Sequence, residues 1–161
     1  MTTPTYLPTG FDGTYKDYLK AKVDKDGCLR MQYRPVTVAD NATAGTTYGV
    51  VPFQRGFRLS MGGTKIYTTD LDTAANTTLN IGYVYKTGSS FTDDPDAFAS
   101  AVSAQTAGFI SFDEEEGLYW VAEDDGWIQI ALAGGPVTTA GTIYNQIVGC
   151  YDSTTGVLAD N

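Results

Sequence analysis

The stretch Leu79-Asn-Ile-Gly-Tyr-Val-Tyr85 decides the fold class of this chain. Its large side chains, Leu79, Ile81, Tyr83 and Tyr85, alternate with Thr78, Asn80 and Gly82, which is the two-residue period of a strand with one buried face. The same type of pattern recurs on both sides of this stretch. It predicts further strands at 29–34, 48–53, 57–61, 65–69, 109–112, 118–122, 127–132 and 143–151.

Glycine pairs separate several of these strands. Gly62-Gly63 predicts a tight hairpin turn between strands 57–61 and 65–69. Gly134-Gly-Pro136 predicts the end of the strand before it, because glycine and proline interrupt regular structure.

One helix is expected among the strands, between Asp93 and Gly108. Asp93-Asp94 can cap it, Pro95 suits its first turn, and Asp96 suits the positive end of the helix dipole. Helical spacing then relates Phe98, Ala101, Val102 and Gln105.

The fold class that follows is all-β: a two-sheet antiparallel β-sandwich, jelly-roll-like in its wiring, with one short helix. A chain of 161 residues fits one domain of this kind. We assign residues 25–161 to the sandwich domain. We assign residues 1–24 to a separate N-terminal docking segment.

The segment 1–24 differs from the rest because its aromatic residues follow no regular period. Four aromatic side chains, separated by polar residues, are the candidate docking residues: Tyr6, Phe11, Tyr15 and Tyr18. Such a segment is suited to lying on a partner's surface. The alternative is that it covers its own domain.

The chain has a net charge of −9 and no histidine. Its negative field repels phosphate backbones and anionic lipid, so we expect neither nucleic acid nor membrane as a partner. A partner with basic patches would be attracted. The N-terminal residues also lack the basic and apolar regions of a signal peptide.

Histidine-dependent chemistry is excluded within one chain, because Ser-His-Asp and Cys-His arrangements need that residue. The sequence also has no Gly-rich phosphate loop and no dinucleotide-binding glycine pattern. We therefore expect no enzyme activity and no cofactor.

Carboxylates are the remaining candidates for chemistry. Asp70-Leu-Asp72 offers oxygen ligands that calcium accepts, but its spacing is not that of an EF-hand. We expect no metal there and interpret Asp70 and Asp72 as turn residues that bind local backbone.

A second acidic region flanks the predicted strand 118–122. Glu114–Glu116 and Glu123–Asp125 lie near Tyr119, Trp120 and Trp127, and paired carboxylates among aromatics are what a glycosidase uses. The competing interpretation, which we favour, is that these acids are solvated strand ends. Charged ends also discourage aggregation between sheet edges.

The two cysteines, Cys28 and Cys150, are far apart in sequence and form no Cys-x-x-Cys pair. Two free thiols is the simpler interpretation. Both cysteines fall in or beside predicted strands, so the sequence leaves open whether they pair.

Two runs resemble small structural proteins of tailed phages. The first is Gly62-Gly-Thr-Lys-Ile-Tyr-Thr-Thr-Asp-Leu-Asp-Thr-Ala-Ala-Asn-Thr-Thr-Leu-Asn-Ile-Gly-Tyr83, where an Asp-Leu-Asp turn precedes a Thr-rich strand. The second is Ile128-Gln-Ile-Ala-Leu-Ala-Gly-Gly-Pro-Val-Thr-Thr-Ala-Gly-Thr-Ile-Tyr144, where a Gly-Gly break separates two strands. The resemblance spans about residues 50–151.

The resemblance implies a capsid decoration or cement protein, made in the host cytoplasm and placed on the capsid surface of the virion. Its implied partners are other virion proteins, above all the major capsid protein, and further copies of itself in a homo-oligomer. The surplus of Tyr and Trp keeps an alternative open, a receptor- or glycan-binding module of a phage tail or fibre.

Overall fold

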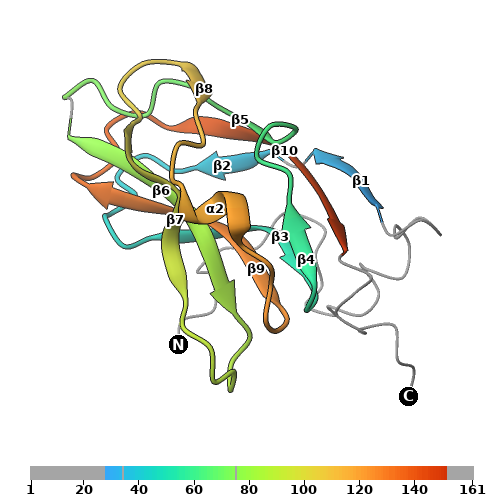
Figure 1. Ribbon diagram of the computed structural model, residues 1–161. Helices are drawn as coiled ribbons and strands as arrows, with labels where there is room; N and C mark the ends of the chain where they lie inside the picture. Colours follow the sequence, from blue (N-terminus) through green and yellow to red (C-terminus); the bar gives the residue numbers. More distant parts are fainter. Residues whose placement is uncertain (1–27, 34, 75, 152–161) are drawn as a thin grey trace.

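A computed structural model describes residues 28–33, 35–74 and 76–151. Two antiparallel sheets pack face to face (Figure 1), which confirms the predicted all-β sandwich. None of the helices in these residues is long and apolar enough to span a membrane.

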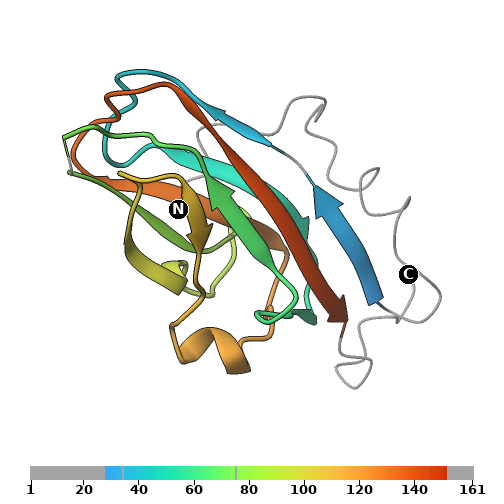
Figure 2. The same cartoon turned by 90° about the horizontal axis from the view of Figure 1, so that it is seen from above.

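The six-stranded sheet is built around one long strand, β10, that has partners on both sides. Figure 2 looks onto this sheet, with β10 lying between β1 and β5 and β8 lying outside β5. Across its width the strands are β1 (Cys28–Tyr33) with β2 (Val36–Val38), then β10 (Gly141–Tyr151), then β4 (Phe57–Leu59) with β5 (Lys65–Thr68), and last β8 (Gly108–Ile110).

The four-stranded sheet has the order β3-β9-β6-β7. Its strands are β3 (Thr47–Phe53), β9 (Gly126–Gly134), β6 (Thr77–Tyr85) and β7 (Asp94–Ser103). The end of β9 at Gly134 confirms the predicted break. β7 and β3 are the edge strands.

The wiring is that of a jelly roll. β1 with β2 forms one interrupted row along β10, and β4 with β5 forms another on its opposite side. Counted this way, each sheet has four rows, and the chain crosses between sheets as two interlocked Greek keys require.

The core lies between the sheets. Along β6 it follows the predicted alternation at Leu79 and Ile81, which are fully buried, and at Tyr85, which is nearly so. Tyr83 is only partly buried, and Gly82 and Val84 are buried as well. Three phenylalanines, Phe53, Phe57 and Phe98, are the largest fully buried side chains. Truncating one of them to alanine is expected to cost about 3–5 kcal/mol, which is large against the stability of a typical domain.

The predicted helix at Asp93–Gly108 is wrong: residues Asp94–Ser103 form the edge strand β7. Register shifts interrupt its pairing with β6, and Ala101 has a positive φ of 50°. These irregularities place Ala97, Phe98 and Ala99 together in the core and break the two-residue period. Pro95 is tolerated because an edge strand has one side without ladder hydrogen bonds.

The predicted strand 118–122 is also wrong. The short helix of the described chain lies there instead, as α2 (Glu116–Tyr119). It begins at Glu116, the last residue of the acidic run, and the amide of Leu118 donates to the carbonyl of Glu115 at 3.1 Å. Between Cys28 and Tyr151 the described chain therefore has one short helix, as expected, but at a different place in the sequence.

The predicted hairpin at Gly62-Gly63 is not formed either. β4 and β5 do not pair with each other but follow one another along β10. Residues 60–64 leave this line as a short excursion, held by the amide of Ser60 donating to the carbonyl of Val148 at 2.8 Å. The two glycines do lie in a turn. The strands on either side of it pair with β10, which is distant in sequence, and not with each other.

Candidate interaction surfaces

The candidate docking residues Tyr6, Phe11, Tyr15 and Tyr18 lie outside the described residues. Their role stays a prediction. The described residues offer six other regions in which polar, charged or aromatic side chains gather.

The first region is the Asp70–Asp72 turn, where the structure uses the carboxylates to bind backbone. Asp72 is buried and accepts hydrogen bonds from the amides of Ala74, Asn76 and Thr77 and from the Thr138 hydroxyl. Asp70 accepts one from the amide of Asp72 at 3.0 Å.

The hydrogen bond from the Thr77 amide, followed by that from Ala74, holds the pKa of Asp72 well below its ordinary value. Both Asp72 oxygens are occupied by protein donors, so this turn has the geometry of a loop clamp. Within the described ranges, no group of three or more acidic or sulfur side chains is arranged to hold a metal ion.

The second region is an acidic hollow beside β7. It has a volume of about 190 Å³ and is lined by Asp94, Asp96, Ala97, Ser100, Glu114 and Glu116. Burial raises the pKa of Asp94, and the neighbouring Asp96 and Glu116 carboxylates raise it further. The lining contains Glu114 and Glu116 but none of Glu123–Asp125, so this hollow does not bring together the two acidic groups of the glycosidase interpretation.

The third region is an aromatic cluster between the sheets, centred on Trp120. Its indole stacks on Tyr83 at 4.7 Å and meets Phe53 and Phe98 edge-on at 5.2 and 5.3 Å. Burial raises the pKa of Tyr83 to about 12. The glycosidase interpretation grouped Trp120 with the acidic residues. In the structure its ring packs inward and anchors α2, which directly precedes it.

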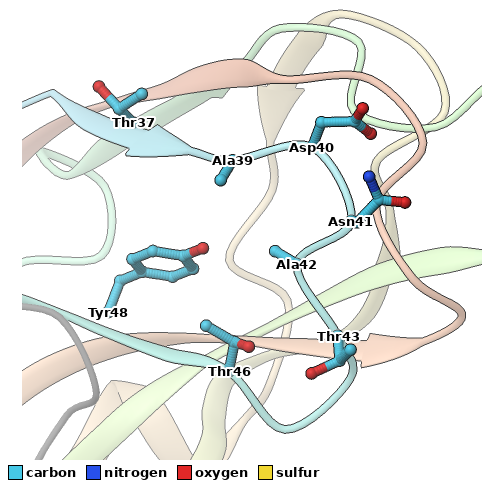
Figure 3. A pocket seen from close by; sticks show the side chains of 8 residues that line it. All are labelled: Thr37, Ala39, Asp40, Asn41, Ala42, Thr43, Thr46 and Tyr48. Atoms are coloured by element: carbon cyan, nitrogen blue, oxygen red, sulfur yellow. The ribbon is translucent and has the colours of Figure 1, made fainter.

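The fourth region is a hollow of about 310 Å³ at the loop between β2 and β3. Figure 3 shows its lining: Thr37, Ala39, Asp40, Asn41, Ala42, Thr43, Thr46 and Tyr48. Tyr48 is only 3% exposed, so its ring offers no stacking surface. The loop is tied to the chain before β10 because the Asn41 amide donates to the carbonyl of Val137 at 3.0 Å.

The fifth region, the outer aromatic row, consists of Phe109 on β8, Tyr67 on β5 and Tyr144 on β10. The strand register places Tyr67 opposite both other residues. Ring centroids of Tyr67 lie 5.3 Å from Phe109 and 6.3 Å from Tyr144. The sequence neighbours on these strands point into the core, namely Ile66, Thr68, Ile110, Ile143 and Asn145. The row therefore faces outward, and Phe109 is 74% exposed.

The sixth region, which we call the α2 knob, consists of the exposed side chains of Leu118 and Tyr119 with the acidic run Glu114–Glu116. Leu118 is 54% exposed and Tyr119 72% exposed. Gly117 is buried between them and the acids, where a β-carbon would lie 2.8 Å from the Phe98 ring. This close approach fixes the helix against the sandwich and turns the two apolar side chains outward.

The cysteines are brought together at the level of the backbone. In the pairing of β1 with β10, Cys28 stands opposite Cys150. The Cys150 thiol is free and half-buried. Sequence could not bring these positions together, because their proximity depends on the pairing of the first and last strands.

The jelly-roll sandwich has counterparts among solved structures. A chain in the capsid of Ralstonia phage GP4 aligns with a TM-score of 0.62 at 20% identity, over 78% of this chain and 84% of that chain. A chain in the cyanophage Pam1 capsid asymmetric unit aligns with a TM-score of 0.57, also at 20% identity, over 76% and 84%. The similarity is one of fold.

No family model matches the sequence, and no curated protein matches it. The alignments cover about three quarters of this chain and 84% of each capsid chain, so the two capsid chains are similar in size to this one.

Proposed function

We propose that this chain is a non-enzymatic structural protein of a phage particle, a decoration or cement protein bound to the outer surface of the head. The observation that carries the proposal is its fold, which matches chains of similar size in two phage capsid structures along most of their length. The sequence resemblance, based on the runs 62–83 and 128–144, supports the same class.

Charge supports a position on the outside of the shell. A net charge of −9 opposes contact with packaged DNA, because bringing acidic side chains near phosphates is electrostatically unfavourable. On the outer face the same charge keeps particles soluble and attracts basic patches of the shell. The partner is then the major capsid protein, and the segment 1–24 with its four aromatic residues supplies part of the contact.

The alternative of a glycan-binding module has less support. Sugar rings stack on exposed, flat aromatic surfaces, yet the planes of Tyr67 and Phe109 are inclined by 72° and those of Tyr67 and Tyr144 by 49°. Rings tilted in this way share no flat face, whereas exposed aromatic side chains are enriched at protein interfaces.

An add-back experiment tests the proposal. Particles made without this chain are mixed with the purified protein, separated from free protein and heated while DNA release is followed. We expect the protein to bind at a fixed number of copies per head and to raise the temperature of DNA release. Absence of binding to heads, with binding to isolated tails or host polysaccharide instead, would contradict the proposal.

A further inference from the structure

We propose that copies of this chain bind one another head to tail, with the α2 knob of one copy seated on the outer aromatic row of the next. This inference rests on the proposed function, because on a capsid surface many copies of the chain lie side by side.

Each of the two surfaces has one strongly exposed aromatic side chain. Phe109 on one surface and Tyr119 on the other are 74% and 72% exposed. Aromatic side chains are enriched at the centres of protein interfaces, where a few of them supply most of the binding energy. Each surface is held rigidly, the row by strand pairing and the knob by the packing of Gly117 and Trp120.

The charges of the two surfaces are opposite. The three strands that form the row, β5, β8 and β10, contain Lys65 as their single charged residue and no acidic residue, although the chain as a whole is strongly acidic. Lys65 lies two residues before Tyr67 on the same strand, and it is exposed. The knob carries Glu114–Glu116.

The salt bridges between described side chains join Lys86 to Asp124 and Asp125, and the knob acids take no part in them. An acidic knob and a basic, aromatic face are complementary.

The two surfaces lie on different parts of the molecule, so the contact joins separate copies. Figure 2 shows α2 beyond the end of β8, outside the sheet on which the row lies. Because the knob is fixed to the sandwich, it cannot fold back onto its own row. A contact between two unlike surfaces repeats from copy to copy and closes into a ring when the rotation allows it.

The test is a mixing experiment on the full-length protein by analytical ultracentrifugation. Tyr119→Ser disables the knob and leaves the row intact, whereas Phe109→Ser disables the row and leaves the knob. We expect the unmodified protein to form oligomers and each variant alone to be monomeric, with association weakened about tenfold or more. An equal mixture of the two variants should form dimers, because one intact knob meets one intact row.

Charge reversal supplies a second arm. Lys65→Glu and Glu115→Lys should each weaken association, and the double variant should recover part of it. Asp40→Lys changes the net charge as much as Glu115→Lys does, from an exposed loop outside both surfaces, and should leave association unchanged.

An unmodified protein that is monomeric at every concentration, or variants whose mixture stays monomeric, would overturn the inference. Both results leave the proposed function intact if the protein still binds heads. Oligomers that form in solution but never bind heads would support the contact between copies and contradict the proposed function.

Discussion

Asp72 joins two loops that are distant in sequence, the turn before β6 and the loop before β10. Its carboxylate accepts from three amides of its own turn and from the Thr138 hydroxyl, 66 residues away. Hydrogen bonds to a buried charged acceptor are stronger than neutral ones. The Asp-Leu-Asp motif therefore stabilises the fold. Its carboxylates bind local backbone, as the sequence predicted.

Asp72→Asn should lower the melting temperature by several degrees at pH 7, because the amide group replaces one acceptor oxygen with a donor that faces other donors. The folded state lowers the pKa of Asp72 below the ordinary 3.8, so its stabilisation is fully present above that pH. As pH falls below 3.8 toward the folded pKa, the difference between the two proteins should shrink. Thermal melts at several pH values measure this.

Asp70→Asn is the matched control for that series. Asp70 lies in the same turn but is exposed and accepts one amide hydrogen bond from Asp72. Its substitution should change the melting temperature much less. Equal melting temperatures for Asp72→Asn and the unmodified protein at pH 7 would contradict the clamp.

The strand β7 is the element on which the sequence interpretation and the structure disagree most, and Gly82 tests it. A β-carbon at Gly82 would lie 2.1 Å from the carbonyl oxygen of Asp94, because β7 crosses β6 closely at this point. Gly82→Ala should therefore lower the free energy of unfolding by about 2 kcal/mol or more. Chemical denaturation measures the change.

Gly62→Ala provides the comparison, since a β-carbon there has open space around it. Its effect should be small. If Gly82→Ala were equally mild, residues 94–96 would not lie against β6, and the edge strand would be misplaced.

The sequence predicted elements well where the pattern was regular and local. The strands around Leu79–Tyr85 and Ile143–Tyr151 alternate cleanly and were found at nearly their observed bounds. β7 was missed because its bulges mimic helical spacing and its Asp-Asp-Pro start resembles a helix cap. The outer aromatic row had no local signal, since Phe109, Tyr67 and Tyr144 meet only through the register of three strands.

At the scale of the whole molecule, charge and exposed apolar side chains are unevenly distributed. Among the described residues, acids lie in the loops, in α2 and in the four-stranded sheet, while the strands of the six-stranded sheet have none. Composition alone predicted attraction to basic partners. It could not predict this separation, which arises only once the jelly roll assigns each strand to a sheet.

Removing residues 1–24 tests the assignment of that segment to docking. The described strands begin at Cys28 and supply a core of their own, so the shortened protein should keep a cooperative thermal melt. Its binding to heads should weaken by about thirtyfold if one aromatic anchor contributes about 2 kcal/mol. Loss of the cooperative melt would assign the segment to the core instead, and undiminished binding would assign attachment to the sandwich.

A cryo-electron-microscopy reconstruction of the particle that contains this chain would test its assignment to the outside of the head. We expect a jelly-roll density on the outer face of the head shell, in contact with the major capsid protein. Density for this chain at the tail or a fibre, or inside the shell against the DNA, would contradict it.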